Sequence, residues 1–323
     1  MKEMNLPPLD KYQYANCLHA IDLSMIYNYG LSYDRIFALY WGFRYTPDPK
    51  KEIENWIDRD GLAYTNEYSL AVMNGVSSVD CAASSRKELL QCIKDSERKN
   101  YAIVVKINLK NLPGQQGYAK IDADHYLVAL GFTSAGELIC HDPYHYHQTI
   151  TLDRKVIEDL SLEFKIYSFS DHDYDRIITN KELMRQSAAF YLNKIRGKQS
   201  ALSSFAKDLE SNTDMAEKLS TITVPMTSIF FFKFNSLIMD RNNFLNFIRK
   251  TLDIQRDTEK TQPVEALAHT CAQKWRSSFL LLSKAMSKKL DNRLLIQTSK
   301  LLSEVAKYEF KLAEQLITYI NIG

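Results

Sequence analysis

Strand-like and helix-like patterns occupy separate stretches of this chain, and this separation limits the folds available to it. Between residues 101 and 169, β-branched and aromatic residues gather in short runs bounded by Asn, Gly and Pro, which is typical of strands. The expected strands cover 101–109, 125–132, 137–142 and 164–169. Helices followed by a meandering sheet predict an α+β domain that ends near residue 170.

Helical patterns precede and follow these strands. Apolar spacing and capping residues predict early helices over 17–29, 32–39, 50–59 and 85–99. After residue 180 the expected helices cover 181–196, 198–211, 226–251, 263–287 and 290–320. A chain of 323 residues is long enough for about two domains. We therefore expect an α+β domain over 1–175 and an all-helical domain over 180–323.

Composition excludes several functional classes. A net charge of +2 indicates neither a nucleic-acid-binding surface nor an acidic tail. The start of the chain lacks a secretory signal pattern, and the longest apolar run, 228–234, is too short to cross a bilayer. Five cysteines without a CxxC pair fit a reducing compartment. We expect a cytoplasmic protein without nucleic-acid or membrane partners.

Cys17 stands at the expected start of the first helix. The apolar residues that follow it indicate a helix buried on most sides. A helix N-terminus offers unpaired backbone N–H groups and a partial positive charge, and both favour a thiolate. The same N–H groups can hold a developing oxyanion. Cys17 is therefore a candidate nucleophile.

His125 and Asp142 stand at the ends of neighbouring strands. His125 opens the second expected strand, Asp142 closes the third, and a turn at 134–136 joins the two. Both residues should then lie at the same end of the sheet, where the carboxylate can orient the imidazole and fix its tautomer. Asp124 is the alternative orienting carboxylate, ranked second because adjacent strand residues face opposite sides.

The chain order Cys17, His125, Asp142 is that of papain-like cysteine enzymes. It predicts a catalytic triad in a papain-like domain, with an N-terminal helix packed on an antiparallel sheet. Gln13 and Asn16 are candidate side-chain donors to the oxyanion hole. Taken singly, the three triad residues have plainer explanations as a buried thiol, a polar strand residue and a turn residue.

A metal site is a second possibility near the same loop. His141, His145 and His147 surround Asp142 in the sequence. Their spacing offers alternate strand residues rather than a held tetrahedral set, so we expect no metal site. The other cysteines, Cys81, Cys92, Cys140 and Cys271, lack a nearby helix start and strand histidine and are interpreted as structural.

Several short motifs resemble those of the butirosin biosynthesis protein H family. They are Cys17-Leu-His-Ala, Asn28-Tyr-Gly-Leu-Ser, Phe37-Ala-Leu-Tyr-Trp-Gly, Asp124-His-Tyr-Leu-Val-Ala-Leu-Gly, His141-Asp-Pro, Ala201-Leu-Ser-Ser-Phe-Ala-Lys-Asp-Leu and a helix with Trp275. The resemblance covers most of the chain, although the motifs are short. The crowded histidines after Asp142 and a variable first helix depart from the family pattern.

This resemblance implies a papain-like acyltransferase of the peptidase C39-like group. Such an enzyme takes an aminoacyl or peptidyl group from the phosphopantetheine thioester of a carrier protein and passes it, through a cysteine thioester, to a small-molecule amine in natural-product biosynthesis. By position, Cys17 is the nucleophile, His125 the base and Asp142 the orienting residue, and the protein needs no cofactor of its own. The helical domain would then cover the cleft or bind partners.

Two other functions stay open from the sequence. One is a cysteine peptidase or amidase of the same fold, and the other is a non-catalytic scaffold. The oligomeric state is not fixed by the sequence either, and a homodimer is left open.

Overall fold

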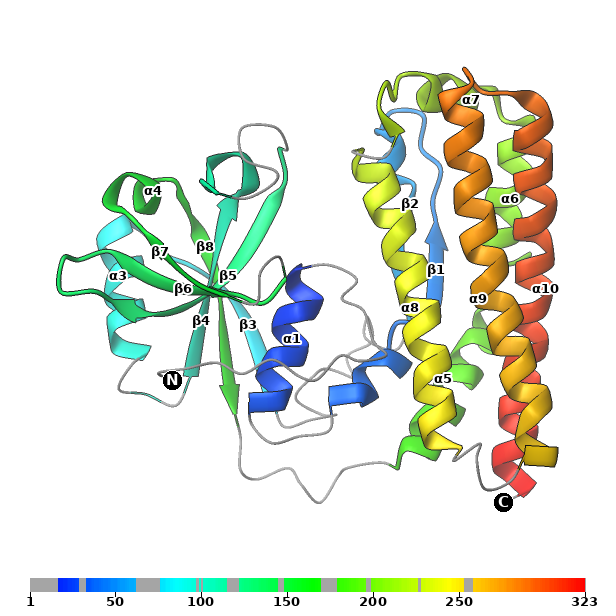
Figure 1. Cartoon of the computed structure of the whole chain (residues 1–323), viewed down its shortest axis with the longest axis horizontal. Helices are drawn as coiled ribbons and strands as arrows, with labels where there is room; N and C mark the ends of the chain where they lie inside the picture. Colours follow the sequence, from blue (N-terminus) through cyan, green and yellow to red (C-terminus); the bar gives the residue numbers. More distant parts are fainter. Residues whose placement is uncertain are drawn as a thin grey trace. The chain divides into compact units, whose positions relative to one another are not determined.

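The computed structural model describes residues 17–28, 33–61, 76–96, 99, 101–114, 122–144, 148–169, 179–195, 199–225, 228–252 and 258–322. They form two compact units. The first holds the described parts of Asn16–Asp34 and Tyr68–Ile177, and the second those of Arg35–Glu67 and Ile178–Gly323. The chain is a mixed helix-and-strand protein with an antiparallel sheet, as expected (Figure 1).

The first unit is built on a six-stranded antiparallel sheet with the order β3-β8-β4-β5-β6-β7. Its strands are β3 (Val76–Ala82), β4 (Tyr101–Asn108), β5 (Asp124–Phe132), β6 (Leu138–Asp142), β7 (Gln148–Leu152) and β8 (Leu160–Phe169). The four predicted strands are confirmed as β4, β5, β6 and β8. The sequence did not predict β3 and β7, because each is an edge strand that pairs with one neighbour.

Helices of the first unit pack on this sheet. They are α1 (Cys17–Asn28), α3 (Arg86–Ser96) and the single turns α4 (Arg154–Glu158) and η5 (Leu109–Asn111). The predicted helix over 85–99 is confirmed as α3, and its Leu89 and Ile93 are buried in a core shared with Val105 and Leu127. Figure 1 shows α1 beside the sheet, where it contacts β5.

The second unit contains long helices and a small hairpin. Its helices are α5 (Asn180–Ile195), α6 (Ala201–Ser211), α7 (Thr213–Ser220), α8 (Ile229–Thr251), α9 (Thr258–Ser287) and α10 (Asn292–Ile322). All five predicted C-terminal helices are confirmed, and α7 is an addition. None of the helices in the described part of the chain is long and apolar enough to cross a membrane.

Residues 35–67 depart from the predicted domain division. They were expected in the first domain, yet their described part belongs to the second unit. After the 3-10 helix η1 (Tyr33–Ala38), the strand β1 (Gly42–Tyr45) pairs antiparallel with β2 (Ile57–Asp60), and the turn η2 (Ile53–Asn55) lies between them. The second unit is therefore not all-helical.

The predicted helix over 50–59 is also wrong, and the packing explains why. Trp56 and Ile57 are buried in the core of the second unit, and β2 pairs with β1 instead of continuing a helix. Phe43 packs edge-on against Phe205 of α6 and Trp275 of α9, with ring centroids 5.7 and 5.9 Å apart. Burial of these aromatic rings against the helices outweighs the weak local helical preference.

Charged residues lie inside the second unit. Glu309 of α10 is fully buried and accepts hydrogen bonds from Arg241 Nε at 3.0 Å, Trp275 Nε1 at 2.8 Å and the Tyr191 hydroxyl at 3.2 Å. These donors belong to α8, α9 and α5, so one carboxylate links four helices. A buried carboxylate is tolerated only when donors replace its lost water.

This network predicts a large difference between two glutamates of α10. Glu309→Leu leaves the Arg241 charge buried and unbalanced and should cost about 3–5 kcal/mol of unfolding free energy. Glu304→Leu removes an exposed pair with Lys274 and should cost at most about 1 kcal/mol. The measurement is urea unfolding followed by tryptophan fluorescence, because all three tryptophans lie in the second unit. Equal losses in the two variants would contradict this reading of the core.

Candidate active site

Cys17 is the first residue of α1, as the sequence predicted. The helix behind it is buried from His19 to Ile26, whereas Cys17 itself is partly exposed. The sulfur is thus fixed on an inflexible helix and still open to a reactant. The first N–H groups of a helix have no partner within the helix, so they remain able to hold an anion beside this sulfur.

His125 and Asp142 are brought together by the structure. Nε2 of His125 lies 2.9 Å from Oδ2 of Asp142, and both side chains are almost completely buried. The second oxygen of the carboxylate, Oδ1, accepts the backbone N–H of Tyr144 at 3.0 Å. Both oxygens of Asp142 are therefore engaged, which fixes the plane of the carboxylate and, through it, the imidazole.

A β-bulge in β5 makes this contact possible. Near the turn, Phe132 pairs with Leu138, but beyond the bulge between Ala129 and Gly131 the partner of Val128 is His141. With unbroken pairing Val128 would face Asp142, on the side of the sheet opposite His125. The extra residue moves Asp142 one place along, so it lies diagonally across from His125 on the same face.

His125 also forms a hydrogen bond with Cys17. Since Nε2 is engaged by Asp142, the other ring nitrogen, Nδ1, is left for the sulfur. Burial lowers the pKa of His125, but the hydrogen bonds to Asp142 and Cys17, with their negative charges, outweigh it and raise the pKa to about 9. At neutral pH the imidazole is therefore protonated and paired with the Asp142 carboxylate.

This arrangement suits nucleophilic chemistry at a carbonyl carbon. A cysteine attacks as its thiolate, and a protonated histidine in the position of His125 can give its proton to a leaving group. After that transfer the neutral imidazole can accept a proton from a second substrate. Asp142 holds the ring through both changes of charge.

The alternative orienting residue, Asp124, does not occupy that role. Its side chain is more than half exposed and pairs with Lys106 at 3.6 Å. The other candidate donors, Gln13 and Asn16, lie outside the described residues. So do His145 and His147, whereas His141 is described and buried.

The described part of the chain contains no group of three or more His, Cys, Asp or Glu residues arranged to hold a metal ion. Two of the remaining cysteines, Cys140 and Cys271, are buried, and burial raises the pKa of each thiol. Burial likewise raises the pKa of Cys92, and the charges of Glu88 and Asp95 add to it. A raised pKa keeps these three thiols in the protonated form, which is a poor nucleophile.

Two residues around the site were missed by the sequence analysis. Tyr167 of β8 donates its hydroxyl proton to Oδ1 of Asp22 at 2.7 Å, a buried bond that fastens α1 to the sheet just over one turn after Cys17. The signal was a carboxylate inside the apolar run Ala20–Met25. Tyr144 is the second: burial raises its pKa, and the charge of Cys17 adds to the effect, which places its side chain near the sulfur.

Comparison with protein-family models finds no match to this chain, and comparison with curated proteins finds none.

The contacts of His125 predict how its titration midpoint differs between the wild type and two variants, Cys17→Ala and Asp142→Asn. The midpoint should lie near pH 9 in the wild type, because the two acceptors outweigh burial. Cys17→Ala removes one of them and should lower the midpoint. Asp142→Asn removes the acceptor with the larger effect on His125. The pKa-lowering effect of burial is then opposed least, so this variant should have the lowest midpoint of the three. Histidine NMR, with His125→Asn to assign the signal, measures all three. A midpoint unchanged by Asp142→Asn would contradict the pairing.

Proposed function

We propose that this chain is a cysteine-dependent acyltransferase of papain-like fold. The observation that carries the proposal is the buried His125–Asp142 pair, hydrogen-bonded to Cys17 at the start of α1. The first helix, the antiparallel sheet behind it and the order of the three residues along the chain fit the papain-like arrangement.

In the first half-reaction, the Cys17 sulfur attacks the carbonyl carbon of an acyl thioester. The oxyanion forms next to the N-terminal N–H groups of α1. The carbon–sulfur bond to the donor breaks, and His125 supplies its proton to the departing thiol. The acyl group is then held as a thioester on Cys17. Since one thioester replaces another, little free energy is lost.

In the second half-reaction, an amine attacks the acyl group on Cys17. His125, now neutral, accepts the proton that the amine nitrogen must lose. The bond to sulfur breaks, the amide product leaves, and the thiolate beside protonated His125 is restored. Aminolysis competes with hydrolysis, so the acceptor must be bound and water kept away.

The resemblance to the butirosin biosynthesis protein H family suggests the substrates. We infer that the donor is an aminoacyl or peptidyl group on the phosphopantetheine arm of a carrier protein, and that the acceptor is a small-molecule amine in natural-product biosynthesis. The phosphopantetheine belongs to the donor, so the enzyme needs no cofactor of its own.

The test is intact-protein mass spectrometry after mixing the full chain with an aminoacyl-pantetheine thioester or the same group on a carrier protein. The wild type should gain the mass of one acyl group, which an added amine removes as an amide. Cys17→Ala should gain none, whereas the control Cys81→Ala, which removes another partly exposed thiol, should behave as the wild type.

A variant of His125 tests the proposed role of this residue in proton transfer. His125→Asn should slow acylation by about 10²–10⁴-fold, the usual contribution of a positioned acid or base. Failure of Cys17 to take up any acyl group would contradict the proposal and favour a scaffold. Uptake followed by release only to water, whatever amine is offered, would favour a peptidase or amidase.

A further inference from the structure

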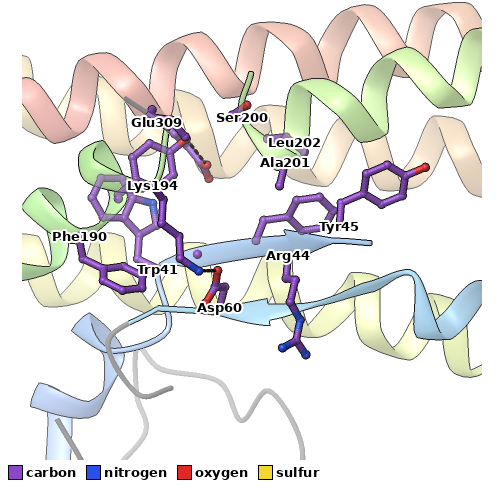
Figure 2. Close-up of a pocket in the computed structure, with 14 residues that line it drawn as sticks. Trp41, Arg44, Tyr45, Asp60, Phe190, Lys194, Ser200, Ala201, Leu202 and Glu309 are labelled. Atoms are coloured by element: carbon purple, nitrogen blue, oxygen red, sulfur yellow. Dashed lines mark hydrogen bonds and ion pairs between the residues drawn. The ribbon is translucent and has the colours of Figure 1, made fainter. Parts of the chain in front are cut away.

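A pocket in the second unit is a separate place for a small molecule to bind (Figure 2). It has a volume of about 180 Å³ and lies between the β1–β2 hairpin, the end of α5 and the start of α6, with Glu309 of α10 in its wall. None of the proposed catalytic residues lines it. Binding in this pocket does not require the proposed acyltransferase chemistry.

The walls of the pocket are mostly aromatic and held in place. Trp41 is stacked between Tyr191 and Phe244, with ring centroids 5.0 and 4.5 Å away. Tyr45 packs against Phe205 and donates its hydroxyl proton to Asp208 at 2.6 Å. Such walls present a fixed apolar surface that needs no rearrangement to receive an apolar group.

Two of the charged residues in the wall are already engaged elsewhere. Arg44 pairs with Asp58 at 3.0 Å, and in Figure 2 its guanidinium points away from Lys194 and Asp60. Glu309 is held by the three donors of the buried network, which include Arg241. Among the described residues that line the pocket, the remaining charges are one cation and one anion.

That cation and anion are Lys194 and Asp60, joined by the ion pair drawn in Figure 2. The Asp60 side chain is buried on β2, and it also accepts the backbone N–H of Gly61 at 2.9 Å. Lys194 is different, because its side chain is 49% exposed and its Nζ lies 4.9 Å from the centre of the Phe190 ring. A buried carboxylate is thus in direct contact with a more exposed ammonium in the wall of the pocket.

The start of α6 adds to the positive side. Ser200, Ala201 and Leu202 line the pocket, and Ser200 caps the helix by accepting the N–H of Ser203. The first turn of a helix carries a partial positive charge. The start of α6 and Lys194 line the same pocket, so both favour a carboxylate in the ligand, whereas Asp60 favours an ammonium.

We infer that this pocket binds a small zwitterion, an α-amino acid with an apolar side chain. Its ammonium pairs with Asp60, its carboxylate pairs with Lys194, and its side chain lies against the aromatic walls. An amine alone would displace Lys194 from Asp60 and leave that ammonium without its partner. A carboxylic acid alone would draw Lys194 away and leave the buried carboxylate without a cation. The zwitterion replaces both halves of the ion pair at once.

The first experiment is calorimetric titration of the full wild-type chain with L-leucine. Two analogues serve as matched probes: 3-methylbutylamine lacks the carboxylate of leucine, and 4-methylpentanoic acid lacks its amine. Leucine should bind saturably, and each analogue should bind at least about tenfold more weakly, since each loses one charged hydrogen bond. Equal binding of leucine and either analogue would overturn the inference, as would the lack of saturable binding.

The variants assign that binding to the pocket. Lys194→Met keeps the length of an exposed side chain and should weaken leucine binding about tenfold or more. Asp60→Asn should do the same, with its fold checked by thermal unfolding because the side chain is buried. The matched control is Lys274→Met, at a lysine that does not line the pocket and that pairs with Glu304, and it should bind leucine as the wild type does. Unchanged affinity in Lys194→Met would overturn the inference.

A last variant separates this site from the proposed chemistry. Cys17→Ala should bind leucine with wild-type affinity, since the pocket does not use the thiol. Loss of acyl transfer in this variant is the result that the acyltransferase proposal predicts. A wild type that binds leucine but takes up no acyl group would count against the acyltransferase proposal alone. Leucine binding that depended on Cys17 would contradict the placement of the ligand in this pocket.

Discussion

The buried hydrogen bond between His125 and Asp142 is the contact on which the candidate site depends. Asp142 is completely removed from water, so its charge needs protein partners, and the imidazole and the N–H of Tyr144 supply them. The same bond opposes the effect of burial on His125, which on its own would favour a neutral ring. A protonated ring beside Cys17 is then the expected state at neutral pH.

A strand bulge and a helix-anchoring hydrogen bond position Asp142 and Cys17. The bulge at Ala129 and Gly131 sets which face Asp142 occupies, and the bond between Asp22 and Tyr167 fastens α1 to the sheet close to Cys17. Both the bulge and this hydrogen bond lie a few residues along the chain from the proposed catalytic side chains. The site is therefore a property of strand register and helix anchoring as much as of the three reactive side chains.

The positions of the three candidate site residues in the fold could largely be predicted from the sequence. Cys17 begins a buried helix, and the strand limits place His125 near Asp142, because helix starts and β-branched runs leave strong local patterns. The bulge could not be predicted: Gly131 hints at it, but a one-residue shift in pairing depends on both strands. The segment 35–67 was assigned to the wrong unit for a similar reason. Its hairpin is stabilised by contacts with helices more than a hundred residues later, such as those of Phe43 with Phe205 and Trp275, which no local pattern records.

The central claim is that Cys17 is activated by His125, and the rate of alkylation tests it most directly. Iodoacetamide labelling of Cys17 and Cys81 can be followed in one sample by peptide mass spectrometry between pH 5.5 and 9. The account predicts that Cys17 reacts much faster than Cys81 at pH 6.5, and that His125→Asn removes this advantage while leaving Cys81 unchanged. Equal rates for the two thiols across the whole range would contradict it.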